Sequence, residues 1–223
     1  MKLYQIKQTN SLLIAGYKNL KDQDFKKLVR YCSIVSFRYN IIGGLNPNAQ
    51  EDVYNAIALQ INSTKKFDVS GLQSVYVSNN SFENDFSTKQ FKNTSRNHKI
   101  VKYIFAKIGE YKCHNAIDPE SDLFTIEHIL PESADENWGD FSQEEINRSV
   151  YRIGNLTLLE KKLNKEAGVL PYLQKKITFD KSSCILTKKI PENYDSWNED
   201  KVSARQKDLA KAAKSIWIVQ ELS

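Results

Sequence analysis

Apolar residues in the first half of the chain recur every three or four positions, which is the spacing of one face of an α-helix. Over residues 22–40, 48–62 and 95–110 this pattern predicts helices. A pair of glycines and a proline between the first two segments mark a break in the chain. The chain up to about residue 118 is therefore predicted to be a platform of packed helices.

Two segments of this half are less regular. Residues 67–80 fit either a short strand or an irregular turn of helix, and the pattern does not choose between them. Phe82, Phe86 and Phe91 form an aromatic stripe. Such a stripe is predicted to lie in the core rather than to stack on nucleic-acid bases.

The second half shows a different pattern, with two short apolar runs followed by a helix-forming segment. Residues 123–130 form an apolar, β-branched run that Pro131 stops, and residues 156–159 form another run after a turn at Gly154. From Lys161 the residues favour a helix that ends at Gly168, so the predicted order is strand, turn, strand and helix. Further helices are predicted over 143–151, over 172–179 and from Asn198 or Asp200 to Val219, with a loop over 191–197.

Four polar residues of this segment are of the kinds that phosphodiester hydrolysis needs: Glu127, His128, Asn155 and Asn164. The reaction needs a base for the attacking water and a cation on the phosphate, and a histidine can be that base near neutral pH. One carboxylate and one amide oxygen are hard ligands, which suit Mg²⁺ or Mn²⁺ better than Zn²⁺. Neighbouring strand residues point to opposite faces, so a bend, a turn or the metal must let Glu127 and His128 serve one site.

The motifs in this segment carry a family resemblance. EHILP, then GNLTLL, then a second Asn nine residues after the first, resemble the ββα-metal (His-Me) finger of HNH nucleases. With Trp138 between the two halves, the segment resembles more narrowly the C-terminal nuclease domain of GmrSD-type, modification-dependent restriction enzymes. The resemblance is strongest over residues 124–173 and extends weakly upstream, over SFRYN and EDVYNAIALQI.

The resemblance implies a role for each of the four residues. His128 matches the general base, and Glu127 matches the neighbouring acidic position that commonly ligates the metal. Many members of the family have Asp there, and Glu is one methylene longer. Asn155 matches the central Asn that braces the loop and orients the histidine, while Asn164 matches the last position of the motif, a metal ligand on the helix.

Charge is unevenly distributed along a chain whose net charge is only +5. Residues 161–189 contain eight lysines against two acids, whereas residues 120–160 contain ten acids against two arginines. Because the basic segment starts on the helix of Asn164, a phosphate backbone is expected there, and the acidic insert 132–145 is expected to point away from DNA or to gate it. The alternative to DNA binding by the lysines is that they form only a solvated face. Arg205 matches an Arg common in the family, and its alternative to a DNA contact is an internal carboxylate. The predicted nucleic-acid contacts are Arg152, Lys161, Lys162, Lys165 and Arg205.

Composition excludes several other classes of protein. No apolar run approaches the roughly 18 residues that span a bilayer, and nothing in the sequence suggests export, so a cytoplasmic protein without membrane contact is expected. Three widely spaced cysteines without a CxxC pair indicate reduced thiols and exclude a four-cysteine zinc cluster. There is no glycine loop of the kind that cradles phosphates.

The sequence thus predicts an α+β protein, with a mainly helical platform over residues 1–118 and a ββα-metal finger braced by C-terminal helices over residues 119–223. Its expected activity is metal-dependent hydrolysis of DNA, and the resemblance implies restriction of foreign, possibly modified, phage DNA. Longer relatives carry an NTP-hydrolysing recognition domain, so either this chain is a fragment or a partner supplies that function. The alternatives are a binding module for protein or nucleic acid with a degenerate finger, and a ribonuclease toxin.

Overall fold

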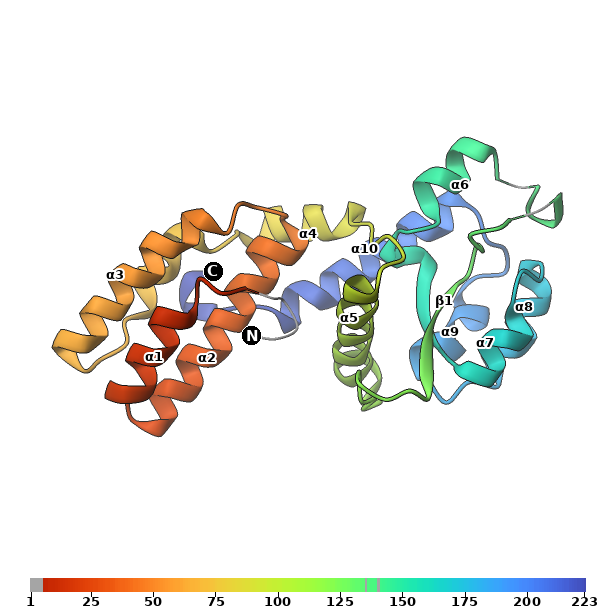
Figure 1. The fold of residues 1–223 in the computed structure, drawn as a ribbon. Helices are drawn as coiled ribbons and strands as arrows, with labels where there is room; N and C mark the ends of the chain where they lie inside the picture. Colours follow the sequence, from red (N-terminus) through yellow and green to blue (C-terminus); the bar gives the residue numbers. More distant parts are fainter. Residues whose placement is uncertain (1–5, 135, 140) are drawn as a thin grey trace. The chain divides into compact units, whose positions relative to one another are not determined.

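Helices make up most of the chain, and one antiparallel pair of strands lies among those of the second half (Figure 1). The computed structural model describes residues 6–134, 136–139 and 141–223. The described chain forms two units, one made of the residues up to Asp85 together with Trp217–Ser223, and the other of Phe86–Ile216. The mainly helical α+β class is confirmed, whereas the functional boundary at residues 118 and 119 stays a prediction.

The first unit is a small helical bundle in which α1 packs against both α2 and α3. The helices predicted over 22–40 and 48–62 are confirmed, although the first continues from Ser36 as a π-helix. Residues 67–80 contain a 3₁₀ helix, so the helical alternative is the correct one. The elements of the first unit are α1 (Asn10–Asn19), α2 (Asp22–Ser36), the π-helix η1 (Phe37–Ile42), α3 (Asn48–Thr64), η2 (Val69–Val75) and the C-terminal turn η5 (Gln220–Leu222).

Arg38 lies fully buried in this unit and holds the C-terminal segment. Its guanidinium donates to the hydroxyl of Tyr76, to the carbonyl oxygen of Trp217 at 3.0 Å and to Oδ1 of Asn79 at 2.7 Å. It also lies over the rings of Tyr76 and Phe82. Arg38 therefore stabilises the interior of the unit by hydrogen bonds and cation–π contacts.

The second unit contains the two strands and the remaining helices (Figure 1). Its β1 strand pairs with β2 in register, with Glu127 opposite Thr157 and His128 opposite Leu156. The α7 helix follows β2 directly and packs against both strands, which confirms the predicted order of strand, turn, strand and helix. The elements are α5 (Ser95–Cys113), β1 (Phe124–His128), η3 (Glu136–Trp138), α6 (Gln143–Ser149), η4 (Ile153–Asn155), β2 (Leu156–Glu160), α7 (Lys161–Ala167), α8 (Tyr172–Asp180), α9 (Ile185–Asn193) and α10 (Glu199–Ile216), with α4 (Asn79–Thr88) joining the two units.

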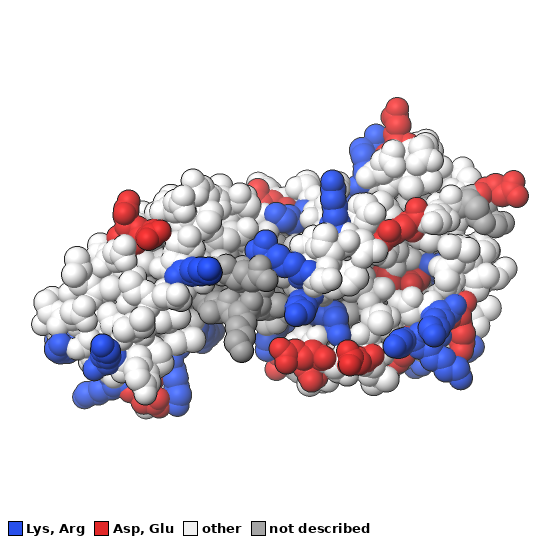
Figure 2. Space-filling model, in the orientation of Figure 1, with Lys and Arg blue, Asp and Glu red and all other residues white. Residues whose placement is uncertain are grey.

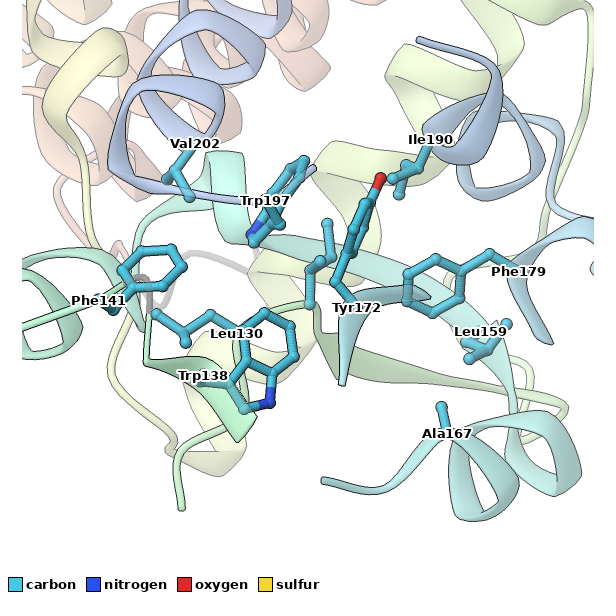
Figure 3. Packing of buried hydrophobic residues seen from close by; sticks show 11 residues of the cluster. Leu130, Trp138, Phe141, Leu159, Ala167, Tyr172, Phe179, Ile190, Trp197 and Val202 are labelled. Carbon is cyan, nitrogen blue, oxygen red and sulfur yellow. The ribbon is translucent and has the colours of Figure 1, made fainter. Parts of the chain in front are cut away.

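An aromatic core ties this ββα element to the C-terminal helices (Figure 3). The rings of Tyr172 and Trp197 are stacked with centroids 5.6 Å apart, and Tyr194 meets Trp197 edge-on at 5.4 Å. Trp138 is also buried there, and its indole N–H donates to the carbonyl oxygen of Val169 at 3.4 Å. Trp138 therefore packs within the core of this unit.

Two C-terminal helices differ in how well the sequence predicts them. The α9 helix contains Pro191, where the sequence pattern predicts the start of a loop. Pro191 lies in the last turn of α9. Leu186 and Ile190, which precede it, are packed in the core and hold the helix. For α10 the predicted cap is confirmed, because Asn198 Oδ1 accepts a hydrogen bond from the backbone N–H of Lys201 at 3.0 Å. In the described residues, every helix is too short or too polar to cross a bilayer.

Candidate functional site

The last two residues of β1 present their side chains to opposite sides of the sheet, as strand geometry requires. Glu127 is buried, whereas the side chain of His128 keeps 15% of its surface exposed. No bend brings them to one face, since both remain in register with β2. They can serve one site only across the end of the strand.

The imidazole of His128 is largely buried and neutral. Burial is the main cause that lowers its pKa to about 4; Glu132 opposes the shift, and the nearby charges of Lys175 and His98 contribute to it. Its Nε2 lies 3.4 Å from Oε1 of Glu132, which at neutral pH is a contact between a neutral ring and a carboxylate rather than an ion pair. A proton on Nε2 suits this contact and leaves Nδ1 as an acceptor.

A set of polar side chains connects this imidazole to solvent. Glu132 accepts hydrogen bonds from Asn93 Nδ2 at 2.8 Å and from the hydroxyl of Tyr151 at 3.4 Å. Asn93 Oδ1 in turn lies 2.6 Å from Nε2 of His98, and the Tyr151 ring meets the His128 ring edge-on. Because Asn93, His98 and Glu132 are exposed, water can reach the His128 side of the strand.

Asn155 is fully buried and uses its whole side-chain amide. Its Oδ1 accepts from the backbone N–H of Leu130 at 2.8 Å and from the indole N–H of Trp197 at 3.0 Å. Its Nδ2 donates to the carbonyl oxygens of Leu130 at 2.9 Å and Val150 at 3.1 Å. The backbone oxygen of Asn155 also accepts from Ile129 at 2.9 Å. The residue thus braces the two positions that follow His128.

Asn164 projects from α7 toward the strand that carries His128. Its Nδ2 donates to the carbonyl oxygen of Ile126 on β1 at 3.0 Å, and the residue is only half-buried. Within the described part of the chain, its Oδ1 accepts no hydrogen bond. The amide is therefore anchored by its nitrogen, and its oxygen remains available to a ligand.

Glu127 is paired with a lysine that the sequence pattern did not indicate as part of the site. Lys175 of α8 has no exposed surface, and its Nζ lies 2.6 Å from Glu127 Oε1 and 2.7 Å from the carbonyl oxygen of His128. Burial raises the pKa of the Glu127 carboxyl and lowers the pKa of Lys175, while their mutual attraction opposes both shifts. One carboxylate oxygen of the predicted metal ligand is thus already neutralised by an ammonium group.

The predicted metal ligands fit a hard divalent cation as oxygen donors. Among the described residues nothing donates to the amide oxygen of Asn164, and Lys175 contacts Oε1 of Glu127 rather than Oε2. Nowhere in the described residues do three His, Cys, Asp or Glu side chains gather into a metal site. Ligation by Glu127 and Asn164 stays a prediction, with the remaining positions left to water and substrate.

The five predicted nucleic-acid contacts separate into two groups. Lys161, Lys162 and Lys165 are exposed on α7, and Figure 2 shows basic side chains gathered over that part of the molecule. Arg152 is instead engaged internally, where it donates to Gln206 Oε1 at 2.9 Å, to Ser203 Oγ at 2.8 Å and to the carbonyl oxygen of Ser87 at 2.8 Å.

Arg205 is buried beneath the turn that carries Asn155. Its Nη1 donates to the carbonyl oxygens of Gly154 at 2.6 Å and Leu156 at 2.7 Å, one on each side of Asn155. Burial lowers its pKa to about 10. The geometry favours a structural role over the expected DNA contact, and the partners are backbone carbonyls rather than the carboxylate that was the alternative.

Lys175 and Glu132 are the two residues near the motif that sequence reasoning missed. A signal for Lys175 was present, since Tyr172, Lys175 and Phe179 share one face of α8 and the other two are core residues. A lysine in the middle of an apolar face is expected to have a buried partner. Glu132 carried no comparable signal, because its neighbours Asn93 and Tyr151 are distant in sequence.

A search of curated proteins finds no match to this chain. A family model, described as the C-terminal domain of GmrSD restriction endonucleases, matches residues 76–212, which is more than half of the chain and includes the whole ββα element. The narrower resemblance, to the C-terminal nuclease domain of GmrSD-type restriction enzymes, is thereby confirmed. The chain belongs to the family of GmrSD restriction endonuclease C-terminal domains.

Proposed function

We propose that this chain is an HNH-type endonuclease domain that hydrolyses the phosphodiester bonds of DNA with a divalent metal, in the restriction of foreign DNA. Membership of a restriction endonuclease family supports the activity and DNA as the substrate. The observation that carries the mechanism is the hydrogen bond from Asn164 Nδ2 to the Ile126 carbonyl oxygen. It ties the side-chain amide of Asn164, on α7, to the backbone of β1 at Ile126, two residues before His128.

His128 is the proposed general base. Its Nδ1 accepts a proton from the attacking water as the water oxygen bonds to phosphorus and the bond to the leaving 3′ oxygen breaks. The lowered pKa keeps the imidazole neutral, and therefore able to accept a proton, throughout the physiological range. Glu132 faces Nε2 and stabilises the tautomer that this role requires.

Asn164 and the second carboxylate oxygen of Glu127 are the proposed ligands of Mg²⁺ or Mn²⁺, which supplies charge neutralisation at the scissile phosphate and the leaving oxygen. So few protein ligands imply a weakly held, largely hydrated cation that EDTA removes. Lys161, Lys162 and Lys165 lie on the same helix as Asn164 and are proposed to bind the phosphate backbone of the substrate.

Cleavage of supercoiled plasmid with Mg²⁺ or Mn²⁺ tests the proposal. Wild type should nick the plasmid, and His128→Ala should lower the rate by about 100-fold or more. His114→Asn is the matched control, because His114 is exposed at the end of α5 with a φ of 50°, a conformation that Asn tolerates. Equal nicking by wild type and His128→Ala, or none with any metal, would leave a binding module with a degenerate finger.

Two further arms of the same assay define the substrate. An RNA of equal length should be cleaved more slowly than DNA, and the opposite preference would indicate a ribonuclease toxin. Plasmids with and without modified bases test the selectivity implied by the restriction family. A recognition domain or partner subunit that hydrolyses NTP is proposed to supply that selectivity, so cleavage by this chain alone should depend little on modification.

A further inference from the structure

We propose that Lys175 is a positioning residue of the nuclease site, which holds the end of β1 so that His128 keeps its reactive orientation. This inference rests on the function proposed above. It is carried by three contacts of one buried ammonium group. Lys175 Nζ donates to Glu127 Oε1 at 2.6 Å and to the His128 carbonyl oxygen at 2.7 Å, and it lies 6.0 Å from the centre of the Trp138 ring.

The position of Lys175 is costly unless it is fully compensated. An ammonium group without exposed surface loses its hydration, and only a close carboxylate and further acceptors offset that loss. Surface lysines of the same segment, such as Lys161 and Lys165, avoid this cost. Lys175 is charged and lies in an aromatic core, where it bonds to Glu127 and to the His128 carbonyl oxygen. These two bonds are therefore what offsets the cost of its burial there.

The two bonds complete a clamp around His128. Asn155 holds the chain after it, through Ile129 and Leu130. Lys175 holds the chain at Glu127 and at the carbonyl group of His128, so the backbone of the imidazole is fixed from both sides. Misplacement of a reacting group by about 1 Å can cost on the order of 100-fold in rate, which is the scale of effect expected when one side of the clamp is removed.

The test uses the full chain with four variants: Lys175→Met, Lys176→Met, Glu127→Gln and the double variant Glu127→Gln/Lys175→Met. Lys176→Met is the matched control, because Lys176 is the next residue of α8 and its contacts lie away from β1, in an ion pair with the exposed Asp195 at 3.6 Å and a cation–π contact 6.0 Å from the centre of the Tyr172 ring. For each variant, kcat and KM for plasmid DNA are measured together with thermal unfolding. Amide hydrogen exchange is measured at Ile129 and Leu130.

Lys175→Met should lower kcat by about 100-fold with KM for DNA changed less than about threefold, and Lys176→Met should match wild type. If Lys175→Met does not fold because Glu127 is left uncompensated, the double variant removes both charges and restores folding. Its kcat should then lie at least about tenfold below that of Glu127→Gln alone, because the bond to the His128 carbonyl is still missing. Equal kcat for these two variants would overturn the positioning role.

Hydrogen exchange separates this inference from the nuclease proposal. In Lys175→Met, or in the double variant where the single one does not fold, the Ile129 and Leu130 amides should exchange at least about tenfold faster, while those of α5 keep their protection. If wild type is inactive and the variant still shows this local loss of protection, the nuclease proposal alone is contradicted. Unchanged protection of both amides in a folded variant overturns the inference whatever the activity of the protein.

Discussion

The side-chain amide of Asn155 binds both backbone groups of Leu130, accepting from its N–H at 2.8 Å and donating to its carbonyl oxygen at 2.9 Å. A strand ladder could not continue past this position, because Pro131 follows and has no N–H to donate. The asparagine replaces the ladder at Leu130, since its amide offers a donor and an acceptor in the arrangement of a peptide group. This relationship fixes the segment that follows His128.

Replacing Asn155 by Ala should therefore damage stability as well as activity. The change leaves the N–H of Leu130, the indole N–H of Trp197 and two carbonyl oxygens without partners in the interior. We expect the free energy of unfolding to fall by about 2–4 kcal/mol, measured by urea denaturation. Asn147→Ala on the exposed face of α6 is the control, and a loss below about 1 kcal/mol at Asn155 would contradict the bracing role.

Asn164→Ala should behave differently, because this side chain is half-buried and makes one hydrogen bond to the described residues. The expected loss of stability is about 1 kcal/mol, whereas Mn²⁺ affinity should fall by at least about tenfold. Mn²⁺ binding can be followed by the EPR signal of the free ion, without any substrate. A variant that binds Mn²⁺ as tightly as wild type would show that the cation is held elsewhere.

The C-terminal turn should make the stability of the first unit sensitive to acid. Hydrogen bonds from Lys27 and Tyr31 lower the pKa of Glu221 to about 2, below its ordinary value. The stabilisation from a depressed carboxyl is present above the unfolded pKa, about 4.3, and is lost as the pH falls toward 2. The difference in unfolding free energy between wild type and Glu221→Gln should thus shrink from pH 6 to pH 2.5. A difference that stays constant would show that this carboxylate is not linked to folding.

The sequence predicted the ββα element well because short-range signals determine it. Pro131 limits the length of β1, Gly154 forms the turn before β2, and the helix formers after Glu160 start α7. Each of these signals acts within a few residues. The order of the elements could therefore be read without knowing what packs against them.

Long-range contacts explain what the sequence could not predict. The bonds of Lys175 to Glu127 and of Arg205 to the turn around Asn155 join residues that are about 50 positions apart. A lysine or arginine in a basic segment is expected at the surface, and only the packing of α8 and α10 buries these two. The helix through Pro191 was missed for the same reason, since tertiary packing outweighed a local breaking signal.

The exposed lysines of α7 and the buried Arg205 should give opposite results in one DNA-binding experiment. Replacing Lys161, Lys162 and Lys165 by Ala should leave thermal unfolding almost unchanged, because all three are solvated. Affinity for DNA should fall, and the slope of log K against log salt should become shallower by about 0.9 for each phosphate that a lysine no longer neutralises, measured by fluorescence anisotropy at several salt concentrations. A merely solvated face would leave that slope intact.

Arg205→Met should lower the unfolding free energy by about 2–4 kcal/mol, because the carbonyl oxygens of Gly154 and Leu156 lose a charged donor in the interior. Its salt slope for DNA, measured below the unfolding temperature, should equal that of wild type, since a guanidinium bonded to backbone carbonyls releases no counterions when DNA binds. Arg205→Lys keeps the charge and one donor, so it should recover part of the stability. A shallower salt slope in folded Arg205→Met would instead place this arginine on the DNA and reverse the structural assignment.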